Sequence, residues 1–159
     1  MRDDIGPYLD ILAEVEHSSL NRGNPEHERW LLKRINSFYD RGAVFLGLED
    51  GSNGEVSGII SVLHEEAPPG IDSWGARAEV LQVGVHKNYR RQGIGSTLLK
   101  YAEQFARDRG VYCLFMMTYA EDHDVIAYYG KNGFVPVATI PDVFGPHLEG
   151  NVVLRKIMR

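Results

Sequence analysis

The sequence has little cysteine, no long apolar run and no excess of positive charge. Cys113 is the only cysteine, so an intramolecular disulfide and a thiolate metal cluster are both excluded. The longest apolar runs, residues 43–48 and 111–117, are far shorter than the roughly 20 residues of a membrane span. No basic-then-apolar secretory segment opens the chain, so we expect a cytoplasmic protein that does not enter a membrane.

The charge and the size narrow the class of protein further. The formal net charge is -5, from 17 Lys+Arg against 22 Asp+Glu, whereas non-specific nucleic-acid binders carry a basic excess. We therefore expect no nucleic-acid partner. The six histidines show no metal-ligand spacing, so we expect no metal. With 159 residues, 43% of them hydrophobic, the chain is predicted to form a single domain over residues 1–159.

Helical and strand patterns alternate along the chain, which predicts a layered α/β or α+β fold. Helices are predicted over residues 7–16, from the cap Asn24-Pro25-Glu26 to Gly42, from Ile94 to Gly110, and over residues 125–131. Strands are predicted over residues 43–48, 56–63, 78–85, 111–118, 134–140 and 152–158. Residues 111–118 are apolar almost throughout, as expected for a strand covered on both faces.

Residues 80–99 combine a strand, a basic turn containing glycines, and the start of a helix. The first four N–H groups of a helix have no partner within it, and its N-terminus carries about half a positive charge. Gly93 and Gly95 lack a Cβ, so an anion can approach the backbone, and Arg90 and Arg91 add charge. These residues predict a phosphate or pyrophosphate site; from them alone, a capped helix without a ligand is equally compatible.

Two motifs in order make this interpretation more specific. The turn reads Arg90-Arg91-Gln92-Gly93-Ile94-Gly95, and beyond the next helix and strand follows Tyr128-Tyr129-Gly130-Lys131-Asn132-Gly133-Phe134. Both resemble signatures of the GNAT N-acetyltransferase superfamily, an Arg/Gln-x-x-Gly-x-Gly/Ala loop and an aromatic-Tyr-x-Lys-x-Gly-Phe segment. The resemblance covers nearly the whole chain. It implies a mixed, mostly antiparallel central sheet with helices on both faces and two splayed central strands.

The resemblance also implies acetyl-CoA as the cosubstrate. The pyrophosphate would be bound by Arg90 and by the backbone N–H groups of Arg91, Gln92, Gly93, Ile94, Gly95 and Ser96. Backbone groups of Val83 and Val85 would hydrogen-bond the pantetheine arm between the splayed strands. The chain departs from the family at Asp122, because an asparagine is common seven residues before the motif tyrosine.

Acetyl transfer to an amine requires a base, because an alkyl ammonium is protonated at neutral pH, and the leaving thiolate benefits from an acid. Tyr129 stands at the motif tyrosine, which protonates the thiolate in many family members; the alternative is a packed aromatic. Glu79 matches the strand position of a catalytic glutamate in some protein-lysine acetyltransferases, and an ordinary strand-end carboxylate is equally compatible. Cys113 lies in an apolar strand pattern and is predicted to be inert.

The acceptor is the least defined part of the prediction. The resemblance implies direct transfer in a ternary complex to a primary amine of a small molecule or peptide. A catalytically silent CoA-binding sensor is the alternative, and a longer acyl chain or a hydroxyl acceptor is also open. In this family the acceptor lies against the first two helices and a late loop, here residues 17–28 and 140–150. A homodimer is left open.

Overall fold

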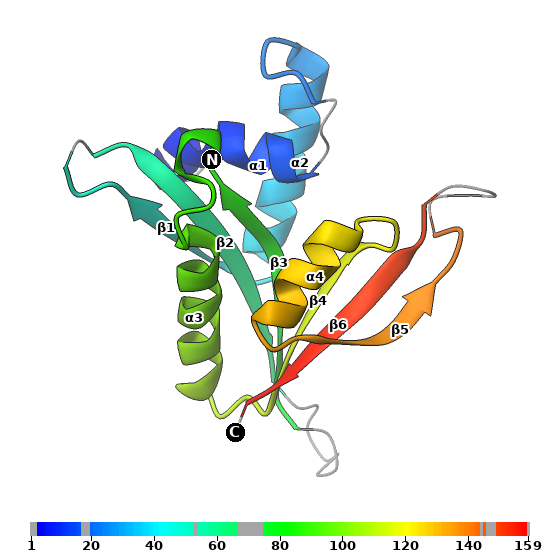
Figure 1. The fold of residues 1–159 in the computed structure, drawn as a ribbon. Helices are drawn as coiled ribbons and strands as arrows, with labels where there is room; N and C mark the ends of the chain where they lie inside the picture. The colour runs from blue at the N-terminus through cyan, green and yellow to red at the C-terminus, as the bar shows by residue number, and fades with distance from the viewer. Residues whose placement is uncertain are drawn as a thin grey trace. The chain divides into compact units, whose positions relative to one another are not determined.

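The computed structural model describes residues 3–16, 20–52, 54–66, 75–143, 145 and 149–158 (Figure 1). The helical elements are η1 (Asp3–Tyr8), α1 (Leu9–Glu16), α2 (Pro25–Asp40), η2 (Lys87–Tyr89), α3 (Ile94–Arg107) and α4 (His123–Lys131). The strands are β1 (Val44–Glu49), β2 (Val56–Glu65), β3 (Arg77–Val85), β4 (Cys113–Tyr119), β5 (Val135–Ile140) and β6 (Asn151–Ile157).

The six strands are hydrogen-bonded in the order β1-β2-β3-β4-β6-β5. The pairs β1–β2, β4–β6 and β5–β6 are antiparallel, and β3–β4 is parallel. The register of β3 with β4 ends at Val80 and Met116, although β3 continues to Val85 and β4 to Tyr119. The predicted mixed, mostly antiparallel sheet is confirmed. Among the described residues, no helix is long and apolar enough to cross a membrane.

The chain divides into two compact units. Unit 1 comprises Met1–Leu63 and Leu81–Ala102, and unit 2 comprises His64–Val80 and Glu103–Arg159. The boundary between them falls inside β2, inside β3 and inside α3. Unit 1 therefore contains the end of β3, the glycine turn and the start of α3, whereas unit 2 contains Glu79 and α4.

In unit 1 helices cover both faces of the sheet. One core joins α1 and α2 to Ile59 of β2; its buried members are Ile5, Tyr8, Leu9, Ile11, Leu12, Ala13, Leu31, Ile35 and Ile59. The adjacent residue Gly58 points to the other face, where a Cβ would lie 3.0 Å from side-chain atoms of Ile94 and Leu98 on α3. The prediction of helices on both faces is confirmed for this unit.

The cap residues place the second helix where the sequence predicts it. The Asn24 side chain accepts a hydrogen bond from the Glu26 N–H at 2.9 Å, Pro25 opens the helix, and Gly42 follows it with φ of 88°. The first helix differs from the prediction, because a 3-10 turn, η1, precedes α1. Ile5 is buried in the same core, which explains why helical structure begins before Pro7.

Unit 2 contains β4, β6 and β5, with β5 at the end of the strand order and exposed at all six residues. Residues 111–118 were predicted to be covered on both faces, and this is only half right. Cys113, Leu114 and Met116 are buried, but Met117 is 52% exposed. Met117 lies one residue beyond Met116, the last residue of β4 that pairs with β3.

Candidate cofactor turn and catalytic residues

The predicted cofactor residues lie along one stretch of unit 1, which runs from the end of β3 through the glycine turn to the start of α3. After β3, the His86 N–H donates to the Ser57 carbonyl of β2 at 3.0 Å, which fixes the end of the strand. The Thr97 N–H donates to the Gly93 carbonyl at 3.0 Å, so Gly93 is the N-cap of α3. The N–H groups of residues 93–96 consequently have no acceptor within the helix, which is the donor set that an anion requires.

The backbone of this turn adopts left-handed conformations at two positions. Arg91 has φ of 64° and Gly93 has φ of 84°. A non-glycine residue at positive φ is uncommon and strained, and left-handed residues are a component of backbone anion nests. A Cβ at Gly93 would meet no atom within 4 Å, so glycine is needed there for its conformation and not for space. Arg91, Gln92 and Gly93 are exposed, so the turn is open to solvent.

Arg90 has protein partners that the sequence did not indicate. Its Nε donates to the Val85 carbonyl at 3.1 Å, and its terminal nitrogen pairs with the Glu14 carboxylate of α1. This guanidinium therefore ties the turn to α1 and to the end of β3. Arg91 is the other arginine of the turn and is exposed.

A break in the alternation of β3 lies just before the two residues predicted to bind the pantetheine arm. Leu81 packs against the cluster that includes Leu63, and the Gln82 side chain accepts a hydrogen bond from Ser61 Oγ at 3.4 Å. Ser61 and Leu63 are two apart on β2 and share a face, so Leu81 and Gln82 reach the same side although they are consecutive. Gln82 is buried and donates to Glu16 at the end of α1. The sequence analysis did not predict this series of hydrogen bonds from Ser61 through Gln82 to Glu16. A glutamine within an apolar strand is nevertheless a sign of a buried polar contact.

Glu79 lies on β3 in unit 2, opposite Phe115 of β4. Its neighbours Ala78 and Val80 are buried, whereas Glu79 is half-buried, so its side chain points to the other face of the strand. This position is compatible with a base and with a structural carboxylate. The catalytic role of Glu79 stays a prediction.

Tyr129 is a buried residue of α4. Its ring centroid lies 5.2 Å from that of Tyr128, and the Phe134 ring meets it edge-on at 6.1 Å. Burial, and secondarily the adjacent Tyr128, raises the pKa of the Tyr129 hydroxyl above the ordinary tyrosine range. A tyrosine hydroxyl is protonated at neutral pH even without this shift, and that is the state that a proton donor needs.

Cys113 is fully buried on β4, as the sequence predicted. Burial raises the pKa of its thiol, with a smaller opposite effect from Arg155. A thiol that stays protonated is a poor nucleophile. Within the described ranges, no three His, Cys, Asp or Glu side chains are grouped so that they could hold a metal ion.

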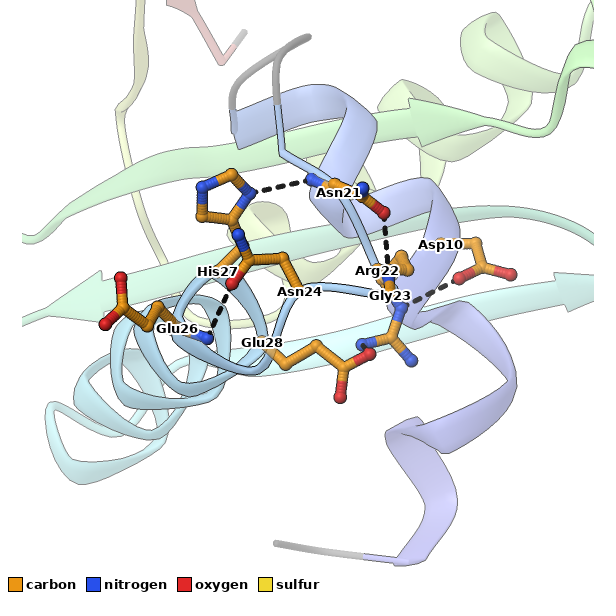
Figure 2. A network of polar contacts seen from close by, with 8 residues as sticks. All are labelled: Asp10, Asn21, Arg22, Gly23, Asn24, Glu26, His27 and Glu28. Atoms are coloured by element: carbon orange, nitrogen blue, oxygen red, sulfur yellow. Dashed lines mark hydrogen bonds and ion pairs between the residues drawn. The ribbon is translucent and has the colours of Figure 1, made fainter.

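The turn between α1 and α2 carries part of the predicted acceptor segment; residues 17–19 lie outside the described residues. Figure 2 shows a polar network over the rest of it. Arg22 joins the two helices, with Nε 2.8 Å from the Asp10 carboxylate and a terminal nitrogen 3.4 Å from that of Glu28. The Asn21 N–H donates to His27 Nδ1 at 3.0 Å. These contacts give the described part of the turn a defined shape.

The late loop, residues 140–150, is described only in part, because residues 144 and 146–148 lie outside the described residues. The Gly150 carbonyl accepts from the Ala120 N–H at 2.9 Å, and the Gly150 N–H donates to the Glu121 side chain at 3.4 Å. One end of the loop is thus tied to the turn that precedes α4. The predicted acceptor role of this loop stays a prediction.

Comparison with known proteins identifies the family. The profile of the Acetyltransferase (GNAT) family matches residues 9–134, which is most of the chain. The chain therefore belongs to the GNAT acetyltransferase family, as the two motifs predicted, and acetyl transfer from acetyl-CoA is the chemistry of that family.

Individual relatives are more distant. The chain is 37% identical over 87 residues to the tRNA(Met) cytidine acetyltransferase TmcA of Aeropyrum pernix, covering 55% of this chain and 11% of that protein. It is 31% identical over 83 residues to N-acetyltransferase family 8 member 2 of Rattus norvegicus, and this match covers 52% of this chain and 35% of the rat protein. The chain thus matches only a tenth to a third of the length of these relatives. The structure of a Bacillus subtilis acetyltransferase in complex with CoA shares the fold, with a TM-score of 0.72 at 17% identity. The match covers 100% of this chain and 94% of the Bacillus chain.

Proposed function

We propose that this protein is an N-acetyltransferase that passes the acetyl group of acetyl-CoA directly to a primary amine of a small molecule or peptide. The observation that carries the proposal is the turn before α3, in which exposed left-handed residues and the N-terminal N–H groups of the helix offer an anion site. Because the chain belongs to the GNAT acetyltransferase family, we take that anion to be the pyrophosphate of acetyl-CoA. The name of the rat relative, an N-acetyltransferase, supports a nitrogen acceptor.

The turn and the end of β3 hold the cosubstrate in this proposal. The N–H groups of residues 93–96 and the exposed Arg91 bind the pyrophosphate, and backbone groups of Val83 and Val85 bind the pantetheine arm. When bound, acetyl-CoA supplies the activated acetyl thioester. Arg90 keeps the turn in place through Glu14 and the Val85 carbonyl, so its contribution to binding is partly indirect.

Glu79 and Tyr129 move the protons in this proposal. An alkyl ammonium has a pKa of about 10.4, so the acceptor must lose a proton before it can attack. Glu79 takes that proton, directly or through water. Tyr129, whose hydroxyl is protonated at neutral pH, donates its proton to the sulfur of the leaving thiolate.

A free-thiol release assay over a broad panel of amines tests the activity. Tyr129→Phe should lower kcat while the affinity for acetyl-CoA stays the same, and Gly93→Asp or Gly95→Asp should abolish CoA binding through steric conflict and charge repulsion. Tight CoA binding with no turnover on any amine would favour a CoA-binding sensor. Unchanged CoA affinity in both glycine variants would show that the turn is not the phosphate site.

A further inference from the structure

A lysine on the last strand holds the end of the helix that carries Tyr129. Lys156 lies on β6 in phase with Val152 and Leu154, which are both buried, so its side chain points to the covered side of the sheet. Lys156 Nζ donates to Glu103 Oε1 at 2.5 Å and to the Asn132 carbonyl at 2.8 Å. The Lys156 and Glu103 side chains are only 22% and 12% exposed, so this is not an ordinary surface ion pair.

The motif glycine after α4 leaves room for this ammonium. Gly133 has φ of 84°, and a Cβ built on it would lie 3.2 Å from Cε and 3.3 Å from Nζ of Lys156. Lys156 Nζ also lies 5.9 Å from the centre of the Phe134 ring. Lys156 thus packs directly against the three-residue turn Asn132–Phe134 that ends the helix.

That same turn is bonded to Tyr129. The N–H groups of Asn132 and Phe134 donate to the Tyr129 carbonyl at 3.0 and 3.1 Å. The Asn132 side chain donates to the Tyr128 carbonyl at 2.9 Å. A shift of the turn would therefore move the backbone of Tyr129, because two hydrogen bonds join the turn to the Tyr129 carbonyl.

The charges are arranged to keep Lys156 in place. An ammonium at the C-terminus of a helix complements the negative end of the helix dipole, and Glu103 balances its charge. Glu103 has a second cation, since Arg107 lies 3.7 Å from its other oxygen, one helical turn away. Loss of Lys156 would leave Glu103 paired with Arg107, so a Lys156 variant should still fold.

We propose that Lys156, supported by Glu103, is a positioning residue for acetyl transfer: it fixes the Asn132–Phe134 turn and thereby orients the Tyr129 hydroxyl. The inference rests on the acid role of Tyr129 in the proposed function. Lys156 itself touches no reacting atom in this assignment. Its removal should disturb the chemical step and leave cosubstrate binding intact.

The kinetic test compares three lysine variants of the full chain. Lys156→Met keeps the aliphatic stem and should lower kcat about tenfold to a hundredfold, because small misplacement of a catalytic group has effects of this order. The KM for acetyl-CoA should stay within about twofold of the wild-type value. Lys156→Arg should retain most of the wild-type kcat, since a guanidinium can also donate to the Glu103 carboxylate and to the Asn132 carbonyl. Lys100→Met removes an exposed lysine of α3 and should change neither parameter.

A double variant separates positioning from a general structural role. If Lys156 acts through Tyr129, Lys156→Met should cause no further fall in kcat when it is introduced into Tyr129→Phe. An equal fall in both backgrounds would overturn the inference, and so would an unchanged kcat in Lys156→Met alone.

Amide hydrogen exchange distinguishes failure of this inference from failure of the proposed function. The Asn132 and Phe134 amides should exchange faster in Lys156→Met than in wild type, and Lys100→Met should not change them. If the exchange rates of these two amides were the same in Lys156→Met and in wild type, Lys156 would not fix the Asn132–Phe134 turn, whatever the kinetics show. Unchanged turnover in Tyr129→Phe would instead show that Tyr129 is not the acid, and Lys156 would then have no catalytic role through it. Faster exchange in Lys156→Met would in that case still show that Lys156 fixes the Asn132–Phe134 turn.

Discussion

Tyr129 is the residue at which burial has the clearest chemical consequence. A free tyrosine has a pKa of about 10, and burial on α4 raises the pKa of this one. The folded protein therefore holds the phenolic proton to a higher pH than the unfolded chain does. The contribution of Tyr129 to stability is complete below about pH 10 and is lost as pH rises further, because only the unfolded chain then ionises there.

We expect Tyr129→Phe to flatten this loss of stability at alkaline pH. The free energy of unfolding of the wild-type protein should fall more steeply than that of Tyr129→Phe as pH rises above about 10. Denaturant titrations at a series of pH values measure this difference. Tyr101→Phe, at a tyrosine that is 48% exposed, is the matched control and should follow the wild type. Parallel pH profiles for wild type and Tyr129→Phe would contradict the prediction.

Individual residues were predictable from the sequence where their role is local. The glycine turn and Tyr129 lie in short motifs. At Gly93 the sequence predicted only room for an anion, and the left-handed backbone was not predicted. The partners Glu14–Arg90 and Glu103–Lys156 are 76 and 53 residues apart, so no local pattern joins them. For Lys156 the sequence still held a signal, since a lysine in phase with Val152 and Leu154 is out of place on a covered face.

At the scale of elements, the start of α2 shows how a cap sets a helix boundary. The Asn24 side chain satisfies the Glu26 N–H, one of four that the helix cannot bond itself. Asn24→Ala should lower the free energy of unfolding by about 1 kcal/mol, whereas Asn24→Asp keeps a capping oxygen and should stay near wild type. Chemical denaturation measures both. An equal loss in the two variants would show that the side-chain oxygen is not the stabilising feature.

Strand and helix positions were predicted well wherever the pattern reflects burial by neighbouring elements along the chain. The predictions differ from the structure where burial depends on distant contacts. Ile5 is buried in one core with residues of α1 and α2, and it lies in the 3-10 turn η1 that precedes α1. Met117 is exposed although the strand around it is apolar, and it lies one residue beyond the pairing of β4 with β3. The sequence pattern alone contains neither contact.

At the scale of the whole molecule, two motifs were sufficient to predict the family, because they are spaced by elements that the fold requires. The division into two compact units was not predictable. Its boundary crosses the chain inside β2, β3 and α3, at Leu63, Val80 and Ala102. Two strands and a helix run from one unit into the other, so each unit contains only part of these three elements.

We therefore expect the chain to unfold as one domain. Differential scanning calorimetry should give a single transition whose calorimetric enthalpy equals the van't Hoff enthalpy. CoA, whose proposed site lies in unit 1, should move that whole transition upward, and at a hundred times its Kd it should add about 2.7 kcal/mol of stability. Gly93→Asp should show one transition without the CoA shift, because the left-handed turn no longer accepts the pyrophosphate. Two separate transitions, of which CoA moves only one, would contradict the prediction of a single domain over residues 1–159 and would leave the units as separately folding parts.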